Sequence, residues 1–298
     1  AYHYGADAAY IGGALFNLRH QSKNTTIEEL AQCSDIAKNL NKKIYLTLNA
    51  FLHEYDKNNL KDYLKEISSL NIDAFIVSDL GVLAAVKEVM PDANIHISTQ
   101  ASVTNSYSCK IYESLGASRI ILARELSLDE IKEIRDNTDL ELESFVHGAV
   151  CMSYSGRCLL SNFLNNRDAN GGECSQVCRW NFKTYIEEKT RPGEFMEIEE
   201  GDEHSTILSS RDLQMAEYLH LLQKAGIDSI KIEGRMKSVY YVANTVRVYR
   251  VLLDLLERIG YESYGEAIKK EPIASYLKEL DTISRRESDT GFYFGRDN

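Results

Sequence analysis

Four of the six cysteines in this chain are gathered in one short stretch, as Cys151, Cys158, Cys174 and Cys178. Their spacing is C-x6-C-x15-C-x3-C, in a segment rich in glycine, serine and asparagine. Cys174 and Cys178 are four residues apart, about one helical turn, so their sulfurs can face the same point. Four thiolates from such a turn-rich segment can close around one metal centre. The segment therefore predicts a metal site held by these four cysteines.

Three kinds of site remain compatible with this spacing. Structural zinc usually takes cysteine pairs two to four residues apart, and only Cys174 and Cys178 fit that rule. An iron–sulfur cluster takes four cysteine thiolates, and its larger volume tolerates irregular spacing. Two disulfides are disfavoured because the chain shows no secretory signal, and disulfides are rare in reducing compartments. Cys33 and Cys109 lie in amphipathic helical patterns, where we expect them to be buried as small apolar residues.

The overall composition is that of a soluble globular protein. The 298 residues are 44% hydrophobic and 27% charged, with a formal net charge of −11 at pH 7. No apolar run reaches the roughly 18 residues of a membrane span, so we expect no membrane and a cytoplasmic location. A chain this acidic lacks broad attraction for nucleic acid, so any RNA contact must use a local patch.

Seven short β-rich runs alternate with longer amphipathic helical patterns, which is typical of a parallel sheet covered by helices. The predicted strands are residues 8–13, 44–50, 74–79, 95–100, 119–125, 140–148 and 229–235. Because seven strands are one short of eight, we predict a TIM-like (β/α)8 barrel whose first βα unit is missing from this chain. An open doubly wound sheet is the alternative, although no GxGxxG loop follows any strand.

The strand–helix rhythm breaks once, at an insertion after barrel strand seven. This insertion, residues 149–210, contains the four cysteines and one or two hairpins, predicted to turn at Arg191-Pro192-Gly193 and near Gly201. We predict that the barrel, insertion included, spans residues 1–260. Residues 261–298 are predicted to be a C-terminal helix and the start of a linker.

The chain opens on a pattern typical of a helix end. Tyr2 to Gly5 reads as the last turn of a helix followed by a C-terminal glycine. We therefore expect the natural start of the protein to lie upstream of Ala1.

Charged residues follow several predicted strands, at the end where barrel enzymes carry their chemistry. Lys231 and Glu233 alternate with isoleucines and so point to one face, where a structural ion pair is the simplest account. Arg124, Lys231 and Arg235 are candidate partners for the carboxylates of a small anion. The candidate catalytic groups are Arg124, His147, Lys231, Glu233 and Arg235.

Basic and aromatic residues are interleaved in the insertion, which suits a splayed-out RNA base and its phosphates. A solvated surface is the competing account. The candidate RNA contacts are Arg157, Arg167, Arg179, Trp180 and Lys183.

The run ESFVHGAVCMSYSGRCLLSNF, followed by NRDANGGECSQVCRW, closely resembles the signature of the collagenase-like peptidase family U32. The segments YGADAAYIGG, IHISTQASVTN, ILARELSLDEI and SIKIEGRMKS are also similar to family segments, so the resemblance covers nearly the whole chain. The family usually begins with one more βα unit and continues, after a GFY-type segment, into a small β domain. The signature positions are Glu143, Phe145, Gly148, Ala149, Cys151, Gly156, Cys158 and Ser161.

The resemblance implies RNA modification rather than proteolysis, in spite of the family name. Similar proteins are required for prephenate-dependent, oxygen-independent hydroxylation of a tRNA uridine, and several hold a 4Fe-4S cluster on four cysteines. Carried onto this chain, the ligands would be Cys151, Cys158 and Cys174, with Cys178 as the fourth, whose position varies between family branches. The implied partners are tRNA, a small prephenate-like anion and a homologous protein.

Two other functions stay open. A peptidase would need an activated nucleophile or water, yet the closest approach to HExxH is His53 to Lys57, where lysine replaces the second zinc ligand. A Cys151–His147 pair lacks any residue that would orient the base. The remaining alternative is a non-catalytic scaffold that delivers RNA or a small molecule to a partner.

Overall fold

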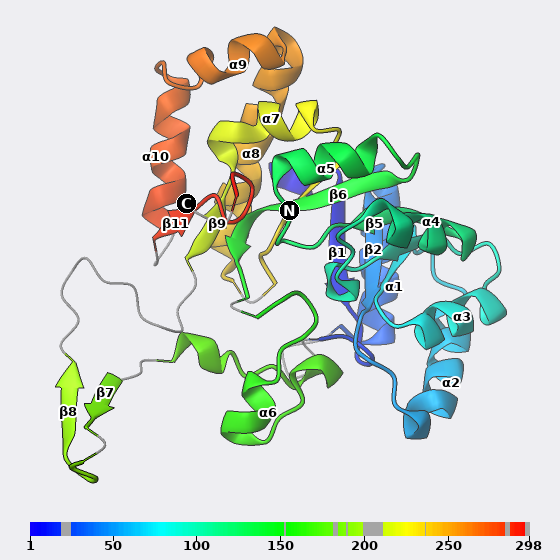
Figure 1. Cartoon of the computed structure of the whole chain (residues 1–298). Helices are drawn as coiled ribbons and strands as arrows, with labels where there is room; N and C mark the ends of the chain where they lie inside the picture. Colours follow the sequence, from blue (N-terminus) through cyan, green and yellow to red (C-terminus); the bar gives the residue numbers. More distant parts are fainter. Residues whose placement is uncertain are drawn as a thin grey trace.

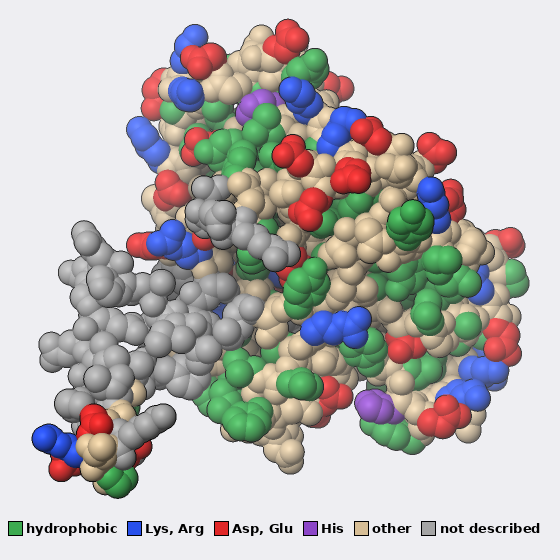
Figure 2. Space-filling model, in the orientation of Figure 1, with side chains coloured by type: hydrophobic (Ala, Val, Ile, Leu, Met, Phe, Trp, Pro, Cys, Tyr) green, Lys and Arg blue, Asp and Glu red, His purple; other side chains and the backbone are tan. Residues whose placement is uncertain are grey.

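The computed structural model describes residues 1–18, 25–151, 153–180, 184–188, 190–198, 211–235, 237–283 and 287–295. Within these ranges the chain is an α/β fold built around a mostly parallel sheet (Figure 1). Asp and Glu side chains are scattered over the face shown in Figure 2, in keeping with the net charge of −11. No helix in the described ranges combines the length and the apolar character that crossing a bilayer requires.

All seven predicted strands are confirmed, with ends that differ by a few residues. They are β1 (Ala8–Gly12), β2 (Lys43–Leu48), β3 (Ala74–Val77), β4 (Ile95–Ile97), β5 (Ala117–Ile121), β6 (Glu141–Ala149) and β10 (Ser229–Ile232). They pair in parallel in chain order from β1 to β6, and β10 follows beside β6. This sequential order is that of a barrel wall, whereas a doubly wound sheet reverses direction at a switch point.

The helices that follow the strands cover the sheet. Several begin at caps that the sequence encodes locally, such as the capping boxes of Thr26 with Glu29 and of Ser127 with Glu130. The helices outside the insertion are α1 (Ile27–Asn39), α2 (Lys57–Ile67), α3 (Leu80–Val89), α4 (Ser106–Ser114), α5 (Leu128–Arg135), α7 (Leu219–Lys224), α8 (Val239–Ile259), α9 (Tyr261–Ala267) and α10 (Ile273–Ile283). The short helical turns outside it are η1 (Tyr2–Tyr4), η2 (Glu54–Asp56), η3 (Thr99–Ala101) and η6 (Ala216–Tyr218).

The core lies between the strands and these helices. Strands β3 and β4 are buried along their whole length, because both faces of a helix-covered parallel sheet are hidden from water. Leu60 and Leu64 of α2 are fully buried, one helical turn apart on the face that meets the sheet. Gly5 adopts a left-handed conformation directly after η1, as the predicted helix end requires.

Two short strands of the C-terminal third were not predicted from the sequence. β9 (Asp212–Gln214) pairs antiparallel with the end of β6. The predicted linker is partly docked: β11 (Ser288–Asp289) pairs with β9, and the buried Tyr293 donates a hydrogen bond to Phe145 O at 2.6 Å. Both segments are too short for a periodic pattern, and long-range pairing decides their structure.

One predicted hairpin of the insertion is confirmed. It consists of β7 (Thr184–Glu187) and β8 (Phe195–Ile198), on either side of the Arg191-Pro192-Gly193 turn. Figure 1 shows it projecting from the rest of the molecule. The second turn, predicted near Gly201, lies outside the described residues.

Candidate functional site

We call residues 151–180 the cysteine segment. It contains three short helical pieces joined by turns. They are α6 (Leu160–Asn165), the π-helical turn η4 (Ala169–Glu173) and η5 (Val177–Arg179). No disulfide joins the four thiols; Cys151 is exposed, and the other three are partly buried. The pKa of the Cys178 thiol is raised above its ordinary value, mainly by burial. The nearby thiols of Cys151, Cys174 and Cys158 add to this rise, and Arg179 opposes it. The other three predicted ligands therefore lie within electrostatic reach of Cys178.

Four thiols can hold either a zinc ion or an iron–sulfur cluster. Zinc–sulfur bonds of about 2.3 Å would bring four sulfurs to within about 3.8 Å of each other. Among the described residues, no three His, Cys, Asp or Glu side chains are grouped closely enough to hold a metal ion. The choice between zinc and an iron–sulfur cluster therefore stays a prediction.

The cysteine segment is anchored on the ends of the barrel strands. Glu125, just past β5, accepts hydrogen bonds from Ser155 N at 2.9 Å and from Ser155 Oγ at 3.1 Å. Ser102 donates to the carbonyl oxygen of Ser155, and Phe51 N donates to Asn170 O at 3.1 Å. The segment therefore bridges the loops that follow β2, β4 and β5.

Hydrogen bonds inside the segment fix the loops that carry Cys158 and Cys174. The carbonyl oxygen of Cys158 accepts from Asn170 Nδ2 at 3.0 Å. The buried Ser161 of α6 contacts Ser175, which follows Cys174, through its hydroxyl at 3.2 Å. Asn165 Nδ2 also donates to Ser175 Oγ, at 2.8 Å. Helix α6 thus braces the two cysteine loops against each other.

Gly156 lets this segment approach the mouth closely. Its φ is +72°, and a Cβ there would lie 2.0 Å from the carbonyl oxygen of Gln100. The conformation and the contact both require glycine, because an L side chain is strained at this φ and would collide with backbone. The glycine of the signature motif therefore has a direct steric reason.

Substituting Gly156→Ala should loosen the cysteine segment and lower the free energy of unfolding by about 1–3 kcal/mol. The thiols of the variant should react several-fold faster with a thiol reagent, since the segment must move off Gln100. Gly193→Ala is the matched control: its φ is also positive, but nothing lies within 4 Å of the added Cβ. Equal thiol reactivity in the two variants would argue against the anchoring role of Gly156.

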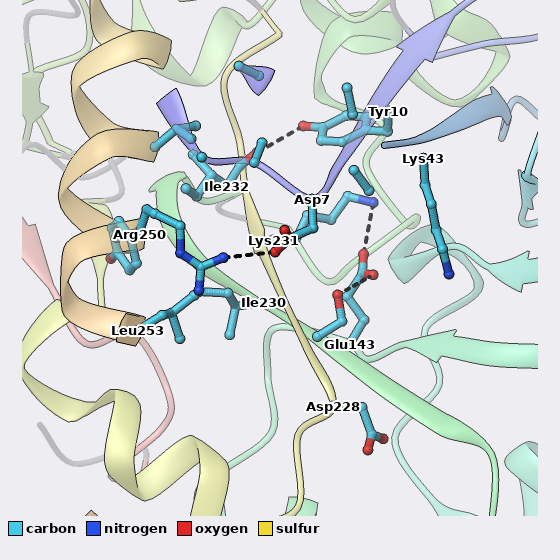
Figure 3. Close-up of a pocket in the computed structure, with 18 of the residues that line it drawn as sticks. Asp7, Tyr10, Lys43, Glu143, Asp228, Ile230, Lys231, Ile232, Arg250 and Leu253 are labelled. Carbon is cyan, nitrogen blue, oxygen red and sulfur yellow. Dashed lines mark hydrogen bonds and ion pairs between the residues drawn. The ribbon is translucent and has the colours of Figure 1, made fainter. Parts of the chain in front are cut away.

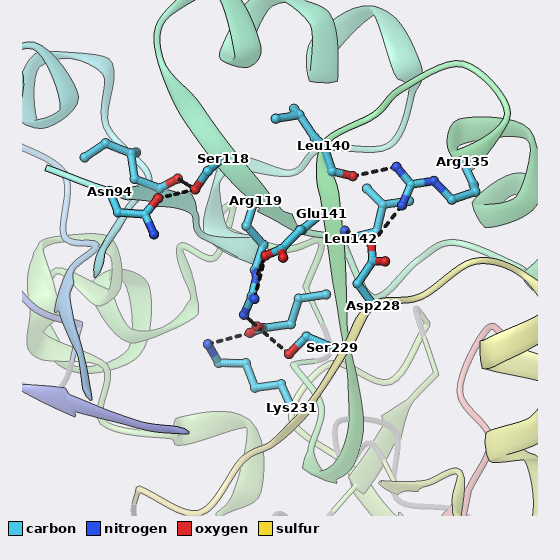
Figure 4. Close-up of polar contacts among 12 residues, drawn as sticks. Asn94, Ser118, Arg119, Arg135, Leu140, Glu141, Leu142, Asp228, Ser229 and Lys231 are labelled. Atoms are coloured by element: carbon cyan, nitrogen blue, oxygen red, sulfur yellow. Dashed lines mark hydrogen bonds and ion pairs between the residues drawn. The ribbon is translucent and has the colours of Figure 1, made fainter. Parts of the chain in front are cut away.

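A buried ion network links residues of β5, β6 and β10. Glu143 Oε1 accepts from Lys231 Nζ at 3.1 Å, and its Oε2 accepts from Arg119 at 2.8 Å and from Ser229 Oγ at 3.0 Å (Figures 3 and 4). Burial raises the pKa of Glu143, but Lys231 and Arg119 outweigh it, and the pKa falls to about 2. Lys231 Nζ also lies 4.2 Å from the centre of the Tyr10 ring.

Lys231 is therefore held in a structural ion pair, and its partner is Glu143 rather than Glu233. Glu233 instead accepts a hydrogen bond from the Tyr10 hydroxyl at 3.1 Å. Lys231 and Glu233 both contact Tyr10, in agreement with the prediction that they share a face. Arg235 donates to Asn17 Oδ1 at 2.5 Å and lies against Gly12.

Arg124 has the least complete set of partners among these candidates. Its guanidinium stacks 4.0 Å from the centre of the Phe145 ring, and NH1 donates to Ala149 O at 3.1 Å. The Nε atom is buried without a hydrogen-bond partner. Within the described ranges no carboxylate pairs with Arg124, so the cation remains available to an anion that enters the mouth.

The prediction that His147 joins the other strand-end residues is wrong. The register of β6 and β10 shifts between Phe145 and His147, and the imidazole packs against Tyr241 and Tyr249 of α8. The Tyr249 hydroxyl donates to Val146 O at 2.8 Å, so its oxygen must accept from His147 Nδ1, 3.3 Å away. A β-bulge of this kind turns the next side chain to the other face, and sequence alternation cannot reveal it.

Two buried histidines should make the fold sensitive to mild acid. Burial lowers the pKa of His96 to about 3 and that of His147 to about 4, from 6.5. Between pH 6.5 and 4 the unfolded chain then binds more protons, so stability falls with falling pH by about 1.4 kcal/mol per pH unit for each histidine. Urea unfolding at several pH values measures this slope. The His96→Gln variant should show a slope smaller by about 1.4 kcal/mol per pH unit, the contribution of one histidine. An unchanged slope would mean that His96 is not buried as a neutral group.

Arg119 and the Asp212–Lys237 ion pair were not predicted from the sequence. Arg119 and Glu143 sit inside neighbouring predicted strands, where charges are costly, and that signal could have identified the network. Asp212 is buried, and its Oδ2 lies 3.1 Å from Lys237 Nζ. Of the RNA-contact candidates, Arg157, Arg167 and Trp180 are exposed, Arg179 donates to Val150 O at 3.4 Å, and Lys183 lies outside the described residues.

Several proteins resemble this chain over nearly its whole length. tRNA hydroxylation protein P1 of Bacillus subtilis is 40% identical over 297 residues, covering 99% of this chain and 68% of that protein. tRNA hydroxylation protein P of Escherichia coli is 37% identical over 332 residues, covering 98% of this chain and 71% of that protein. An uncharacterized protease of Methanocaldococcus jannaschii is 42% identical over 296 residues, covering 98% and 69%.

Among solved structures, the U32 peptidase Mk0906 aligns with a TM-score of 0.42 at 20% identity, over 50% of this chain and 64% of that one. The model of the family described as peptidase family U32 matches residues 1–298. This match confirms the resemblance drawn from the signature around the cysteines. The chain belongs to peptidase family U32.

Proposed function

We propose that this protein hydroxylates a uridine of tRNA without molecular oxygen, in the cytoplasm, with a 4Fe-4S cluster on Cys151, Cys158, Cys174 and Cys178. The observation that carries the proposal is the gathering of four thiols over the barrel mouth. Relatives named tRNA hydroxylation proteins support it, as does an Escherichia coli 23S rRNA 5-hydroxycytidine synthase, 36% identical over 253 residues. That synthase match covers 85% of this chain and 37% of the relative.

Proteolysis is the less favoured function for this geometry. His147 is turned against Tyr249 and is not oriented as a base toward Cys151. His53 Nε2 lies 3.7 Å from Asp168 Oδ2 of the cysteine segment. Among the described residues, neither a zinc-protease ligand set nor an oriented cysteine–histidine pair is present.

The four thiolates would hold the cluster, with the loops of Cys158 and Cys174 braced by α6. When bound, the cluster supplies a redox or Lewis-acid centre at the mouth. The anchors Glu125 and Gly156 keep the segment on the strand ends. A base that enters the mouth would then lie between this segment and the polar layer around Tyr10, Glu233 and Arg235.

Hydroxylation replaces a C–H bond of the base by a C–OH bond. In balanced form, the base and one water give the hydroxylated base, two electrons and two protons. The oxygen atom comes from water or from a hydroxyl group of the anionic co-substrate. A hydroxyl group that leaves as hydroxide has the oxidation level of water, so the electron balance is the same in both cases. The two electrons must pass to an external electron acceptor, which the assay below supplies.

We further propose that Arg124 and Arg235 bind the carboxylates of a small prephenate-like co-substrate. Arg124 offers a buried Nε and a stacked guanidinium with no carboxylate partner in the described ranges. Lys231 is not part of this site, because its charge is already matched by Glu143. Charge-assisted hydrogen bonds to carboxylate are the strongest contacts available here.

The RNA would approach from the cysteine segment, where Trp180 and Arg157 are exposed and Arg179 adjoins Cys178. Exposed aromatic and arginine side chains suit an unstacked base and its phosphates. A homologous protein remains a proposed partner in this step.

We also propose that the sheet closes as an eight-stranded barrel. β1 and β10 each pair with one strand on one side only, and a cavity of about 730 Å³ lies between them (Figure 3). A further parallel strand, from the βα unit that the family resemblance implies before β1, would pair with both edges.

Modification of tRNA by the purified protein tests the proposal. Anaerobically prepared protein, prephenate, an electron acceptor and tRNA from a strain lacking the modification should yield hydroxylated uridine, one per protein or more. A scaffold would yield none without an added enzyme. Incubation with gelatin, alongside a Cys151→Ala control, tests the peptidase alternative, and cleavage that needs Cys151 would favour it.

A further inference from the structure

Glu233 is a half-buried carboxylate at the carboxyl end of β10. It follows Ile232, the last residue of the strand, and its backbone N donates to His147 O at 2.9 Å. The neighbouring buried charge, Lys231, is paired with Glu143. In the part of the chain that the structure describes, no lysine or arginine forms an ion pair with Glu233. The carboxylate is therefore not committed to a structural ion pair.

Tyr10 of β1 fixes the direction of this carboxylate. Its hydroxyl lies 3.1 Å from Glu233 Oε2 and 3.3 Å from Ile232 O, on the side that Figure 3 shows turned toward β10. Burial, and after it the charge of Glu233, raises the pKa of Tyr10 well above its ordinary value, so the phenol keeps its proton. A hydrogen bond to a carboxylate is stronger than one to a carbonyl, so the bond to Glu233 prevails. It leaves Oε1 of Glu233 without a hydrogen-bond partner among the described residues.

Two arginines lie near this pair. Arg124 and Arg235 both oppose the rise in the pKa of Tyr10, so both cations are within electrostatic reach of its hydroxyl. They are the residues proposed above to bind the carboxylates of the small co-substrate. An anion held by them would lie in the neighbourhood of Glu233, whose carboxylate is oriented and has one oxygen available. A positioned carboxylate beside a substrate site is the arrangement of a general base.

The end of β6 connects Glu233 to the cysteine segment. A Cβ on Gly148 would lie 3.0 Å from Glu233 Cβ, so β6 passes Glu233 closely and without a side chain. Cys151 follows three residues later, and three extended residues span at most about 11 Å. Tyr241 of α8 lies within electrostatic reach of both Glu233 and Arg179 of the cysteine segment. Glu233 therefore lies near the start of the cysteine segment as well as near the proposed anion site.

We propose that Glu233 is the base that removes the proton from the carbon of the RNA base that becomes hydroxylated, and that Tyr10 is its positioning residue. This inference rests on the proposed function. In the step, the C–H bond breaks, its proton goes to Glu233 Oε1 and its electron pair passes to the external electron acceptor, while the C–O bond forms with a lone pair of the oxygen donor. A water molecule that supplies the oxygen releases its second proton to solvent. The C–H proton leaves whichever donor supplies the oxygen, so the base is needed in both cases.

A purely structural role is the competing account, because the same hydrogen bond joins β1 to β10. Glu233→Gln separates the two, since glutamine keeps an acceptor for the Tyr10 hydroxyl but does not take up a proton. Hydroxylation of tRNA by this variant should fall about 100-fold or more, the usual contribution of a general base, and its residual rate should no longer fall at acidic pH. Glu233→Asp, which keeps the carboxylate, should retain the acidic limb of the pH–rate profile and part of the rate.

Tyr10→Phe tests the positioning residue, because it keeps the ring beside Lys231 and removes only the hydroxyl. That hydroxyl favours the charged carboxylate, so its loss should move the acidic limb of the pH–rate profile to higher pH by about 1 unit. An unmoved limb would mean that the hydrogen bond is structural alone. The other charged and titratable groups around the pair stay in place in every variant; they are Arg124, Arg179, Asp212, Lys231, Arg235 and Tyr241.

Glu141→Gln is the matched control, since it removes an exposed carboxylate at the opposite end of β6. It should leave the rate and the pH profile unchanged, and each variant should keep its dissociation constant for tRNA within about 2-fold of that of the unaltered protein. Hydroxylation by Glu233→Gln at the full rate, or an equal loss in Glu141→Gln, would overturn the proposal. Absence of hydroxylation by the unaltered protein would instead refute the proposed function, and this inference with it.

Discussion

Replacing Cys158 by alanine is expected to remove the cluster almost completely. Anaerobically purified protein should contain about four iron and four sulfide per chain, and the Cys158→Ala variant should retain a small fraction of either. The reason is geometric: Cys158 lies at the end of a loop fixed by Asn170 and α6, so no other thiol can move into its place. Iron and sulfide analysis, with the visible absorption of the cluster, measures the effect.

The chain offers a matched control for this variant. Cys109→Ala also removes a thiol, but Cys109 is buried in α4 outside the cysteine segment, and the variant should keep its iron. Cys178→Ala tests the proposed fourth ligand separately. One zinc per chain in every preparation, or equal iron in the Cys158 and Cys109 variants, would contradict an iron–sulfur site.

Replacing Glu143 by glutamine is expected to be the most destabilising single change in the barrel. The amide keeps the volume of the side chain but leaves Lys231 and Arg119 buried beside a group without charge. Removing one partner from a buried ion network costs about 3–5 kcal/mol of the free energy of unfolding, because the remaining charges are uncompensated. Urea unfolding at pH 7 measures this loss.

Glu141→Gln is the control, since Glu141 binds the same Arg119 from a side chain that is 55% exposed. It should cost about 1 kcal/mol or less, as solvent-exposed ion pairs do. The pKa of Glu143 falls from 4.5 to about 2, so the carboxylate stabilises the fold above pH 4.5, and this contribution is lost as the pH falls toward 2. The Glu143→Gln variant should lack that part of the acid transition. Equal losses of unfolding free energy in Glu143→Gln and Glu141→Gln would refute the buried network.

Local patterns predicted the strands well, because strands depend on residues near one another in the sequence. The strands from β1 to β6 are short apolar runs between amphipathic helices, and their sequential pairing follows from that rhythm. The four cysteines gather because turns and short helices bring neighbouring loops together. The iron–sulfur cluster stays a prediction from the family resemblance, because the spacing fits zinc as well.

The rest depended on contacts between distant residues. β9 is three residues long and exists because it pairs with the end of β6. The direction of His147 follows from a register shift that alternation cannot show. Lys231 was recognised as a buried charge, yet its partner Glu143 lies on another strand, and only the sheet order brings them together. The contact of Gly156 with Gln100 is likewise invisible until the insertion is placed over the mouth.

The most direct test measures hydroxylated uridine in tRNA from a strain that lacks the corresponding gene. Mass spectrometry of the tRNA nucleosides should find the hydroxylated uridine restored when the unaltered full-length protein is expressed. It should stay absent with Cys158→Ala and return with Cys109→Ala, at equal protein levels and under strict exclusion of oxygen. Restoration by Cys158→Ala would contradict the claim that the cysteine segment carries the chemistry, and failure of the unaltered protein would contradict tRNA hydroxylation itself.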